Sequence, residues 1–286
     1  MRTILIAGCG FVGRIALALF KQARWEVTVI TRTQDSANRL QAEFGCRALS
    51  CDISNRGEVA ALDLPGFDAV VDCVSAGASD TEEYRRVYYQ GAVNLLEAQP
   101  VARFLFTSSS SVYGQDDGSL VTEESPATPE GGPGLVLRST EELVLARGGI
   151  VTRLTGIYGP GRAMLLRRFL EGSAVIEGDG SRHLNQIHCA DAASAVFFLL
   201  SRPGIAGVFN VTDNASPTQR EFYGWLADYY DKPLPPEGPA NPQRRRFATD
   251  KRVSNARLRA LGWEPVYPSF LHALKQNPGL LERLMN

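Results

Sequence analysis

The sequence predicts a doubly wound α/β fold, in which helices cover both faces of a parallel sheet and a smaller C-terminal lobe follows. Short apolar runs alternate with helix-like segments through the first half of the 286 residues, which is typical of parallel strands joined by helical crossovers. A glycine-rich turn also joins the first strand to the first helix. The expected strands are Thr3–Ala7, Val27–Thr31, Cys46–Leu49, Ala69–Val74, Phe104–Ser108 and Ile150–Leu154, and the helices between them are Gly10–Lys21, Asp35–Phe44, Asp80–Ala98 and Leu135–Ala146.

The glycine-rich turn is the most informative local motif. Gly8, Gly10 and Gly13 have the G-x-G-x-x-G spacing. In such a turn the first glycine permits the tight bend, the second lets the backbone approach a diphosphate, and the third lets the helix pack on the strand. The amides around Phe11 and Val12 would face the phosphates at the positive end of the helix dipole. A tight turn without a ligand is the alternative.

The second half of the chain breaks the alternation. A Pro-rich stretch covers residues 233–242, and short elements are separated by glycine and proline. We expect a dinucleotide-binding Rossmann domain over residues 1–160 and a mainly substrate-binding lobe over 161–286, with strands near 186–188 and 207–211 that return to the sheet. The helices expected in this half are Thr218–Tyr230, Asn255–Leu261, Ser269–Gln276 and Gly279–Leu284.

Composition narrows the class of partner. The 30 basic residues nearly balance the 31 acidic ones, so no global field favours nucleic acid or an anionic membrane. The five cysteines form no C-x-x-C pair and no metal-site spacing. The apolar N-terminus is too short for a membrane span. These features predict a reduced, cytoplasmic protein without a metal, acting on a small molecule.

Arg32 follows the second strand, where NAD-preferring sites usually place a carboxylate for the adenosine ribose. A guanidinium there can bind a 2′-phosphate in a forked, charge-assisted contact. We therefore expect NADP as the cofactor, with NAD as the alternative. Arg32 could instead be solvated in a loop or stack on adenine, which either dinucleotide allows.

Residues that follow the third and fourth strands complete the predicted cofactor site. Asp52 and Ile53 come after the third strand, where they can meet the adenine edge. A helix or turn cap is the alternative for Asp52. Val74 and Ser75 end the fourth strand, at the same carboxyl edge of the sheet.

Several motifs together resemble the extended short-chain dehydrogenase/reductases, the NAD(P)-dependent epimerase/dehydratase family that works largely on nucleotide sugars. Besides the glycine turn and Asp52, they include Phe209-Asn210-Val211 and Ile187-His188 followed by Asp191. The remaining matches are Asn94-Leu95-Leu96-Glu97-Ala98, the Ser-rich strand end Thr107-Ser108-Ser109-Ser110-Ser111-Val112-Tyr113-Gly114, and Arg153 with Ile157-Tyr158-Gly159-Pro160-Gly161.

The resemblance implies a catalytic serine, tyrosine and lysine, of which only the serine is present. Ser109 matches it, whereas Ser108, Ser110 and Ser111 are expected to satisfy backbone groups at the strand end. Counting from Tyr113-Gly114, the tyrosine position is Gly134 and the lysine position is Arg138. Glycine supplies no proton, and arginine stays charged. Arg138 would bind the cofactor ribose, or alternatively pair with Glu141 or Glu142 at helical spacing.

Other groups could move the proton. Tyr113, Tyr88 and Tyr158 are candidates, each with aromatic packing as the alternative, and His188 is another, with a structural role as its alternative. Five arginines are candidates for binding an anionic substrate or for solvated surface: Arg153, Arg162, Arg167, Arg168 and Arg182.

Two functions remain open. The first is an NAD(P)-dependent oxidoreductase or epimerase/dehydratase with atypical proton handling, in which Ser109 holds the reacting oxygen. The second is a catalytically silent NADP-binding sensor or scaffold, favoured by Gly134 and Arg138. A homodimer formed through Asp80–Ala98 and Leu135–Ala146 is also implied by the resemblance, with Leu135, Leu143 and Val144 as its apolar surface or, alternatively, as contacts to this chain's own sheet.

Overall fold

A computed structural model of the chain describes residues 1–78, 80–100, 102–239 and 249–277. The chain divides into two compact units, each built from three separate stretches of sequence. A single boundary at residue 160 between a cofactor domain and a substrate lobe stays a prediction. Unit 1 consists of residues 1–112, 127–153 and 192–209, and unit 2 of residues 113–126, 154–191 and 210–286.

Unit 1 is built on a seven-stranded sheet with the order β11-β7-β5-β4-β1-β2-β3. The pairings from β5 across to β3 are parallel, and the strand order reverses direction between β1 and β4, as in doubly wound dinucleotide folds. The strands are β1 (Thr3–Ala7), β2 (Glu26–Thr31), β3 (Arg47–Ser50), β4 (Ala69–Asp72), β5 (Arg103–Ser109), β7 (Ile150–Leu154) and β11 (Gly207–Val211).

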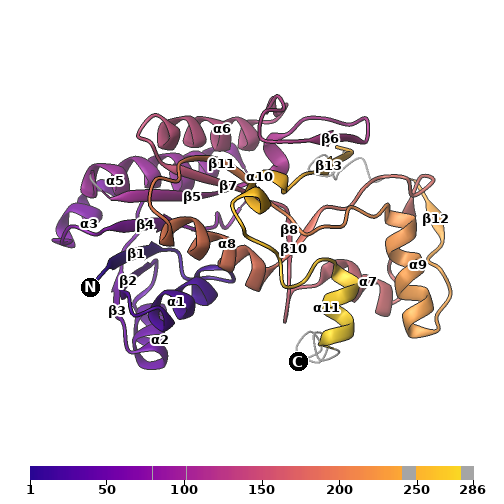
Figure 1. Cartoon of the computed structure of the whole chain (residues 1–286), viewed down its shortest axis with the longest axis horizontal. Helices are drawn as coiled ribbons and strands as arrows, with labels where there is room; N and C mark the ends of the chain where they lie inside the picture. The colour runs from indigo at the N-terminus through magenta and orange to yellow at the C-terminus, as the bar shows by residue number, and fades with distance from the viewer. Residues whose placement is uncertain (79, 101, 240–248, 278–286) are drawn as a thin grey trace. The chain divides into compact units, whose positions relative to one another are not determined.

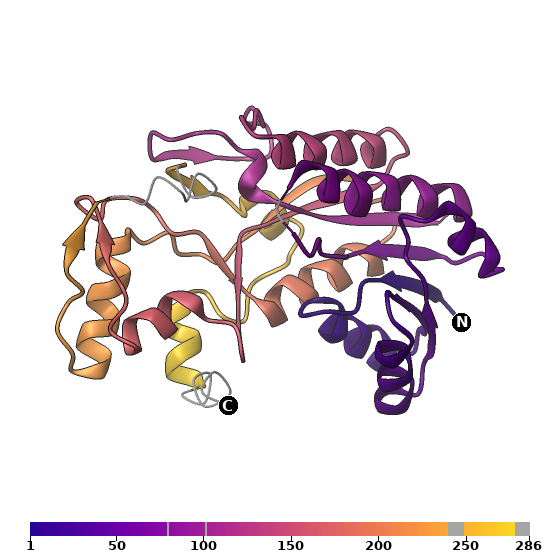
Figure 2. The same ribbon diagram turned by 180° about the vertical axis from the view of Figure 1, so that it is seen from behind.

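Helices cover both faces of this sheet, as Figure 1 and Figure 2 show: α5 and α6 lie over one face, and α1, α2 and α8 over the other. Aromatic rings connect the helices on the second face: the buried Phe20 of α1 packs edge-on against Phe197 of α8, with ring centroids 5.1 Å apart. The helices are α1 (Gly13–Gln22), α2 (Gln34–Phe44), α3 (Arg56–Ala61), α4 (Thr81–Tyr84), α5 (Gly91–Ala98), α6 (Gly132–Leu145) and α8 (Cys189–Ser201), with a π-helical segment η1 (Arg85–Gln90) and a 3₁₀ turn η2 (Ser110–Val112).

The central strands are apolar because both of their faces are covered. Ile4, Leu5 and Ile6 of β1 are completely buried. Asp72, the last residue of β4, is also completely buried, although its side chain is ionisable. The doubly wound α/β fold predicted from the sequence is therefore confirmed.

Unit 2 has short elements around a separate apolar core, in which Leu166, Phe222 and Phe270 are among the buried side chains. Its strands pair two by two: β6 with β13, β8 with β10, and β9 with β12. They are β6 (Ser119–Val121), β8 (Gly156–Tyr158), β9 (Ile176–Glu177), β10 (Gln186–His188), β12 (Glu237–Gly238) and β13 (Lys251–Val253), and the helices are α7 (Met164–Leu170), α9 (Gln219–Tyr230), α10 (Ala256–Ala260) and α11 (Phe270–Gln276).

Several elements differ from the sequence-based expectation. The single helix expected over 80–98 is divided into α4, η1 and α5 by the π-helical segment. Helix α6 begins at Gly132 rather than Leu135, because Pro133 fits the first helical turn, where its missing N–H has no partner to lose. Strand β11 joins the central sheet, whereas β10 pairs with β8 outside it. The helix expected at 279–284 and the end of the Pro-rich stretch, 240–242, lie outside the described residues.

Candidate functional site

The turn between β1 and α1 requires glycine at two positions. Gly8 has a φ of +87°, and a Cβ there would lie 2.6 Å from the amide nitrogen of Val74. A Cβ on Gly13 would lie 2.2 Å from the carbonyl oxygen of Gly8. Both distances are shorter than real Cβ contacts allow. The turn, the start of α1 and the end of β4 are therefore packed backbone against backbone.

Gly10 is different, because its side-chain position is open. A Cβ there would have no atom within 4 Å, and the residue is exposed. Helix α1 starts nearby with Val12 as its N-cap, which is 8% exposed and makes no side-chain cap, and the first turn holds no acidic residue. Phe11 between them is half-buried. An uncapped helix N-terminus beside an unobstructed glycine fits the diphosphate of a dinucleotide.

Arg32 lies exposed directly after β2. The next residue, Thr33, caps α2 by accepting a hydrogen bond from the amide of Ser36 at 3.3 Å. None of the ion pairs recorded among the described residues involves Arg32. Its guanidinium is thus available for a ligand at the end of β2.

The Asp52 carboxylate is held by its own turn and by η1. Oδ1 accepts hydrogen bonds from the amide and hydroxyl of Ser54, at 3.0 and 2.7 Å, and Oδ2 accepts one from Arg86 at 2.7 Å. Burial acts to raise the pKa of Asp52, but the hydrogen bonds from Ser54 and Arg86 outweigh it and the pKa is lowered. The carboxylate is therefore an ionised acceptor at neutral pH.

Ile53 is fixed from the opposite side by α5. Its carbonyl oxygen accepts a hydrogen bond from the buried Asn94 side chain at 2.8 Å. Gly91 packs against it so closely that a Cβ would lie 2.8 Å from Ile53 Cδ1. Val74 and Ser75 follow β4, half-buried and exposed respectively.

The Ser-rich end of β5 contains two serines in different roles. Ser109 is half-buried, and its hydroxyl oxygen accepts a hydrogen bond from the amide of Ser111 at 3.2 Å. The expectation that Ser108 satisfies strand-end backbone groups is wrong. Its buried hydroxyl instead donates to the Glu141 carboxylate at 2.6 Å, because Glu141 of α6 faces the sheet at that point.

Glu141 is the centre of a buried charge network. It is completely buried and forms ion pairs with Arg153 of β7 at 2.7 Å and with Arg138 of α6 at 2.7 Å. Arg153 is only 3% exposed. Arg153 is one of the arginines expected to bind an anionic substrate or to be solvated at the surface, and both expectations are wrong, because the buried Glu141 carboxylate takes its guanidinium.

Arg138 bridges two glutamates of its own helix. Nη1 contacts Glu141 at 2.7 Å and Nη2 contacts Glu142 at 2.9 Å. The pairing expected at helical spacing is thus present, and a ribose contact by the same guanidinium stays a prediction. Four residues earlier, Gly134 packs on Pro129, whose Cβ would lie 2.5 Å from a Cβ at position 134. A larger side chain at 134 needs this loop to move.

The remaining proton-transfer candidates lie in unit 2, apart from Tyr88. Tyr113 is completely buried, and its hydroxyl lies 2.9 Å from the Thr122 carbonyl oxygen and 2.8 Å from Asn210 Oδ1. Tyr158 is 2% exposed, and burial raises its pKa. Burial lowers the pKa of His188 to about 4, so its imidazole is neutral at physiological pH.

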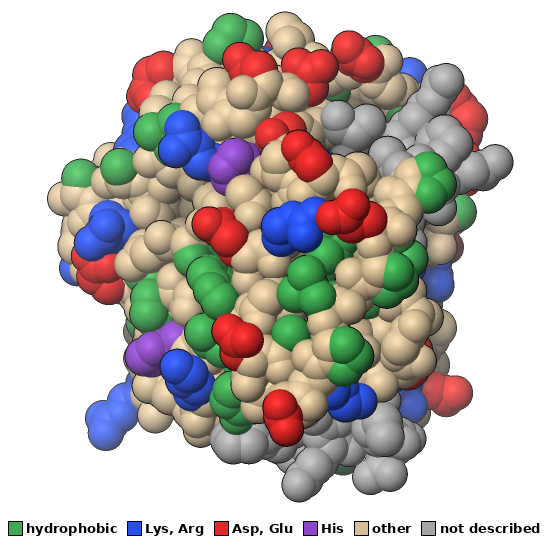
Figure 3. Space-filling view, turned by 90° about the vertical axis from the view of Figure 1, so that its right-hand side faces the viewer, with side chains coloured by type: hydrophobic (Ala, Val, Ile, Leu, Met, Phe, Trp, Pro, Cys, Tyr) green, Lys and Arg blue, Asp and Glu red, His purple; other side chains and the backbone are tan. Residues whose placement is uncertain are grey.

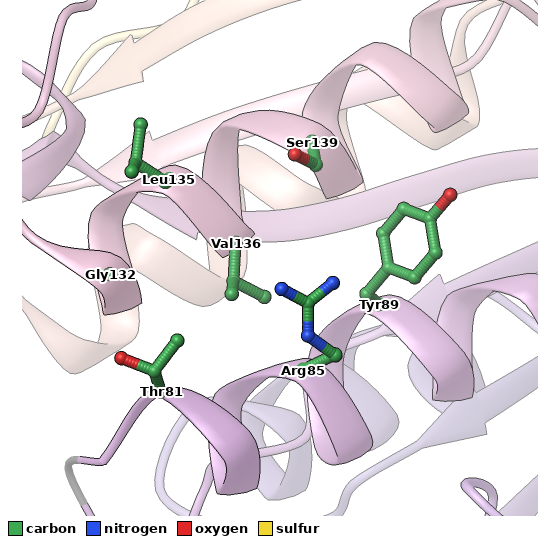
Figure 4. A pocket seen from close by; sticks show the side chains of 7 residues that line it. All are labelled: Thr81, Arg85, Tyr89, Gly132, Leu135, Val136 and Ser139. Carbon is green, nitrogen blue, oxygen red and sulfur yellow. The ribbon is translucent and has the colours of Figure 1, made fainter.

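A small pocket opens between two helical segments of unit 1. Figure 4 shows the Arg85 side chain extending from η1 towards Val136 of α6. The lining residues are Thr81, Arg85, Tyr89, Gly132, Leu135, Val136 and Ser139. The pocket includes none of the glycine-turn residues and is separate from the predicted cofactor site.

The face in Figure 3 shows acidic and basic side chains interspersed. Within the described residues no three His, Cys, Asp or Glu side chains gather in a way that could hold a metal ion. No described helix has the length and apolar character needed to cross a membrane. All five cysteines are free thiols.

Comparison with known proteins identifies the family. The model of the NAD dependent epimerase/dehydratase family matches residues 4–212. Protein YeeZ of Escherichia coli K12 is 29% identical over 243 residues, which cover 79% of this chain and 83% of YeeZ.

Solved structures with the same fold extend over the whole chain. A protein of Methylobacillus flagellatus, assigned provisionally as an NAD-dependent epimerase/dehydratase, is 27% identical with a TM-score of 0.79, covering 100% of this chain and 99% of that one. The UDP-glucose 4-epimerase of Thermus thermophilus, solved with NAD, is 20% identical with a TM-score of 0.79 and 99% coverage of both chains. At that identity the epimerase shows the fold alone. Because the family model spans the chain from β1 to Thr212, the protein belongs to the NAD dependent epimerase/dehydratase family.

Proposed function

We propose that this protein is an NADP(H)-binding oxidoreductase or epimerase/dehydratase that acts on a small, nucleotide-sugar-like substrate. The open position at Gly10 beside the uncapped N-terminus of α1 carries the proposal. These groups would hold the diphosphate, while Asp52 and Ile53 would meet the adenine and Val74 and Ser75 would line the path of the cofactor. Membership of the NAD dependent epimerase/dehydratase family supports the class of reaction.

The nicotinamide, when bound, would give or accept a hydride. This chain would supply the remaining chemistry: Ser109 would hold the reacting oxygen, and Arg138 would contact the ribose as well as its two glutamates. The hydroxyl of Tyr113 is already within hydrogen-bond distance of Thr122 and Asn210. Because this hydroxyl is also completely buried, we propose that a water molecule, and not Tyr113, exchanges the proton with the substrate.

The direct test is turnover. Purified protein is mixed with NADPH or NADP⁺ and a panel of aldehydes, ketones and nucleotide sugars. The absorbance of NADPH measures net oxidation or reduction, and analysis of the products detects epimerisation or dehydration. The proposal expects turnover with at least one member. Tight cofactor binding without turnover across the panel would instead favour the sensor or scaffold alternative, which Gly134 and its packing on Pro129 support.

Replacing Ser109 by alanine should lower kcat by at least about tenfold on any substrate the panel identifies, since a hydrogen bond to a developing oxyanion contributes about 10²–10³ in rate. Cofactor affinity should not change. Ser111→Ala is the matched control, because Ser111 is exposed and only its amide contacts Ser109. Equal kcat values for the two variants would remove Ser109 from the mechanism.

Cofactor preference depends on Arg32. Arg32→Ala should weaken NADPH binding about 10- to 100-fold, because hydrogen bonds to charged groups contribute about 1.5–3 kcal/mol. NADH binding should stay within about twofold, since NADH lacks the 2′-phosphate. The control is Arg147→Ala, another exposed arginine of unit 1. If both cofactors weaken equally, Arg32 does not read the 2′-phosphate and NAD is the better candidate.

We also propose that the protein is cytoplasmic and forms a homodimer through η1, α5 and α6. Leu135 is 54% exposed and Leu143 is half-buried, so both could contribute to an interface. Val144 is completely buried and packs within its own chain. A monomeric mass by light scattering at micromolar concentration would exclude the dimer.

A further inference from the structure

The loop after β4, residues 73–77, forms one wall of the glycine turn. The amide of Cys73 donates to the Ala7 carbonyl oxygen at 2.9 Å, and the Cys73 thiol donates to the Gly8 carbonyl oxygen. Val74 lies so near that a Cβ on Gly8 would meet its amide nitrogen at 2.6 Å. Any shift of this loop therefore changes the shape of the turn itself.

Tyr88 holds the loop from the π-helical segment η1. Its hydroxyl accepts a hydrogen bond from the amide of Ala76 at 3.2 Å. The ring packs edge-on against Tyr84 and Phe106, with centroids 4.9 and 6.1 Å away. π-Helical turns are rare and often occur at functional sites. Here the wide turn places this hydroxyl on the loop.

Asp72 lies beneath the same loop. It is completely buried at the end of β4, in register with Ala7 of β1 and Phe106 of β5. Oδ1 accepts a long hydrogen bond from the Val74 amide at 3.4 Å, and Oδ2 has no hydrogen-bond partner within the described structure. A buried carboxylate in this position would be poorly solvated.

The surroundings of Asp72 contain no compensating positive charge among the described residues. Burial raises the pKa of Asp72 to about 7. The titratable groups that interact with it are Tyr88 on η1 and Cys73 beside it, and both have raised pKa values, chiefly from burial. The facing strands present Ala7 and Phe106, which do not titrate. Asp72 is thus the group that changes charge near neutral pH.

We propose that Asp72 and Tyr88 are positioning residues that hold the loop 73–77 against the glycine turn and make dinucleotide affinity depend on pH. The inference rests on the proposed cofactor site. A protonated Asp72 is neutral and leaves the loop in place. An ionised Asp72 adds a negative charge beneath the loop, which strengthens its attraction for the Val74 amide and opposes binding of the diphosphate. Affinity should therefore fall as pH rises through about 7.

The test is the dissociation constant of NADH, measured by calorimetry between pH 6 and 8.5, where the charge of NADH does not change. For the unmodified chain it should rise at least about fivefold over this range, below the limit of about tenfold per pH unit set by one proton. Asp72→Asn should bind with a pH-independent constant. Tyr88→Phe should bind about 3- to 10-fold more weakly at pH 6, as expected for one lost hydrogen bond.

Tyr89→Phe is the matched control, because Tyr89 is the next residue of η1 and lines the separate pocket between η1 and α6. Its NADH affinity should equal that of the unmodified chain. A pH-independent constant in the unmodified chain, or equal affinities of Tyr88→Phe and Tyr89→Phe, overturns the inference while leaving the cofactor site intact. If Asp72→Asn does not fold, the NADH affinities of the two tyrosine variants and the pH dependence of NADH binding by the unmodified chain still test the inference. Absence of NADH binding at every pH would defeat the proposed function as well.

Discussion

Gly10→Ala is expected to weaken dinucleotide binding by at least about tenfold, or about 1.4 kcal/mol, with almost no effect on folding. The added methyl group would project into the open space where we place the diphosphate, since no protein atom lies within 4 Å of it. The free energy of unfolding should change by no more than about 0.5 kcal/mol, as is usual for exposed positions. Calorimetry with NADPH and chemical denaturation measure the two quantities.

Gly66→Ala is the control for this change. Gly66 is also exposed, and a Cβ there would also have no atom within 4 Å, but it lies in the loop before β4. Its variant should keep both the affinity and the stability. If Gly10→Ala binds NADPH as tightly as Gly66→Ala, the diphosphate does not lie against Gly10 and the proposed site is wrong.

The second large effect is on stability. Glu141→Ala should lower the free energy of unfolding by about 3–5 kcal/mol, because removing one partner of a buried ion pair leaves the other uncompensated. Arg153, which is only 3% exposed, would lose the carboxylate that neutralises it, and the Ser108 hydroxyl would lose its hydrogen-bond acceptor. Equilibrium urea denaturation with matched m-values measures the change.

The adjacent glutamate provides the contrast. Glu142 also pairs with Arg138, at 2.9 Å, but its side chain is 66% exposed. Glu142→Ala should therefore cost less than about 1 kcal/mol, as exposed ion pairs do. Similar losses for the two variants would mean that the network around Glu141 does not stabilise unit 1 in the way its burial indicates.

Much of unit 1 can be predicted from the sequence because its signals are local. Strands β1 and β7 have the predicted bounds, since uninterrupted apolar runs between turns are typical of strands buried on both faces. The glycine turn follows from spacing alone, and Gly8 and Gly13 show the packing that explains it. Arg138 and its glutamates follow directly from helical periodicity.

Other features depend on contacts that periodicity does not encode. Residues 80–98 have the composition of one ordinary helix, so the sequence does not reveal the π-helical segment that places Tyr88 against the loop 73–77. Ser108 and Ser109 differ only in which face of β5 meets α6. Periodicity does not single out Asp72, because it lies within an apolar run. A lone carboxylate between Val71 and Cys73 does, however, indicate a buried titratable group.

The central claim is that the glycine turn binds a dinucleotide, and titration calorimetry of the full chain with NADPH, NADP⁺, NADH and NAD⁺ tests it most directly. The account predicts saturable binding at one site per chain, with NADPH tighter than NADH. If none of the four dinucleotides binds at millimolar concentration to protein shown to be folded, the account is contradicted.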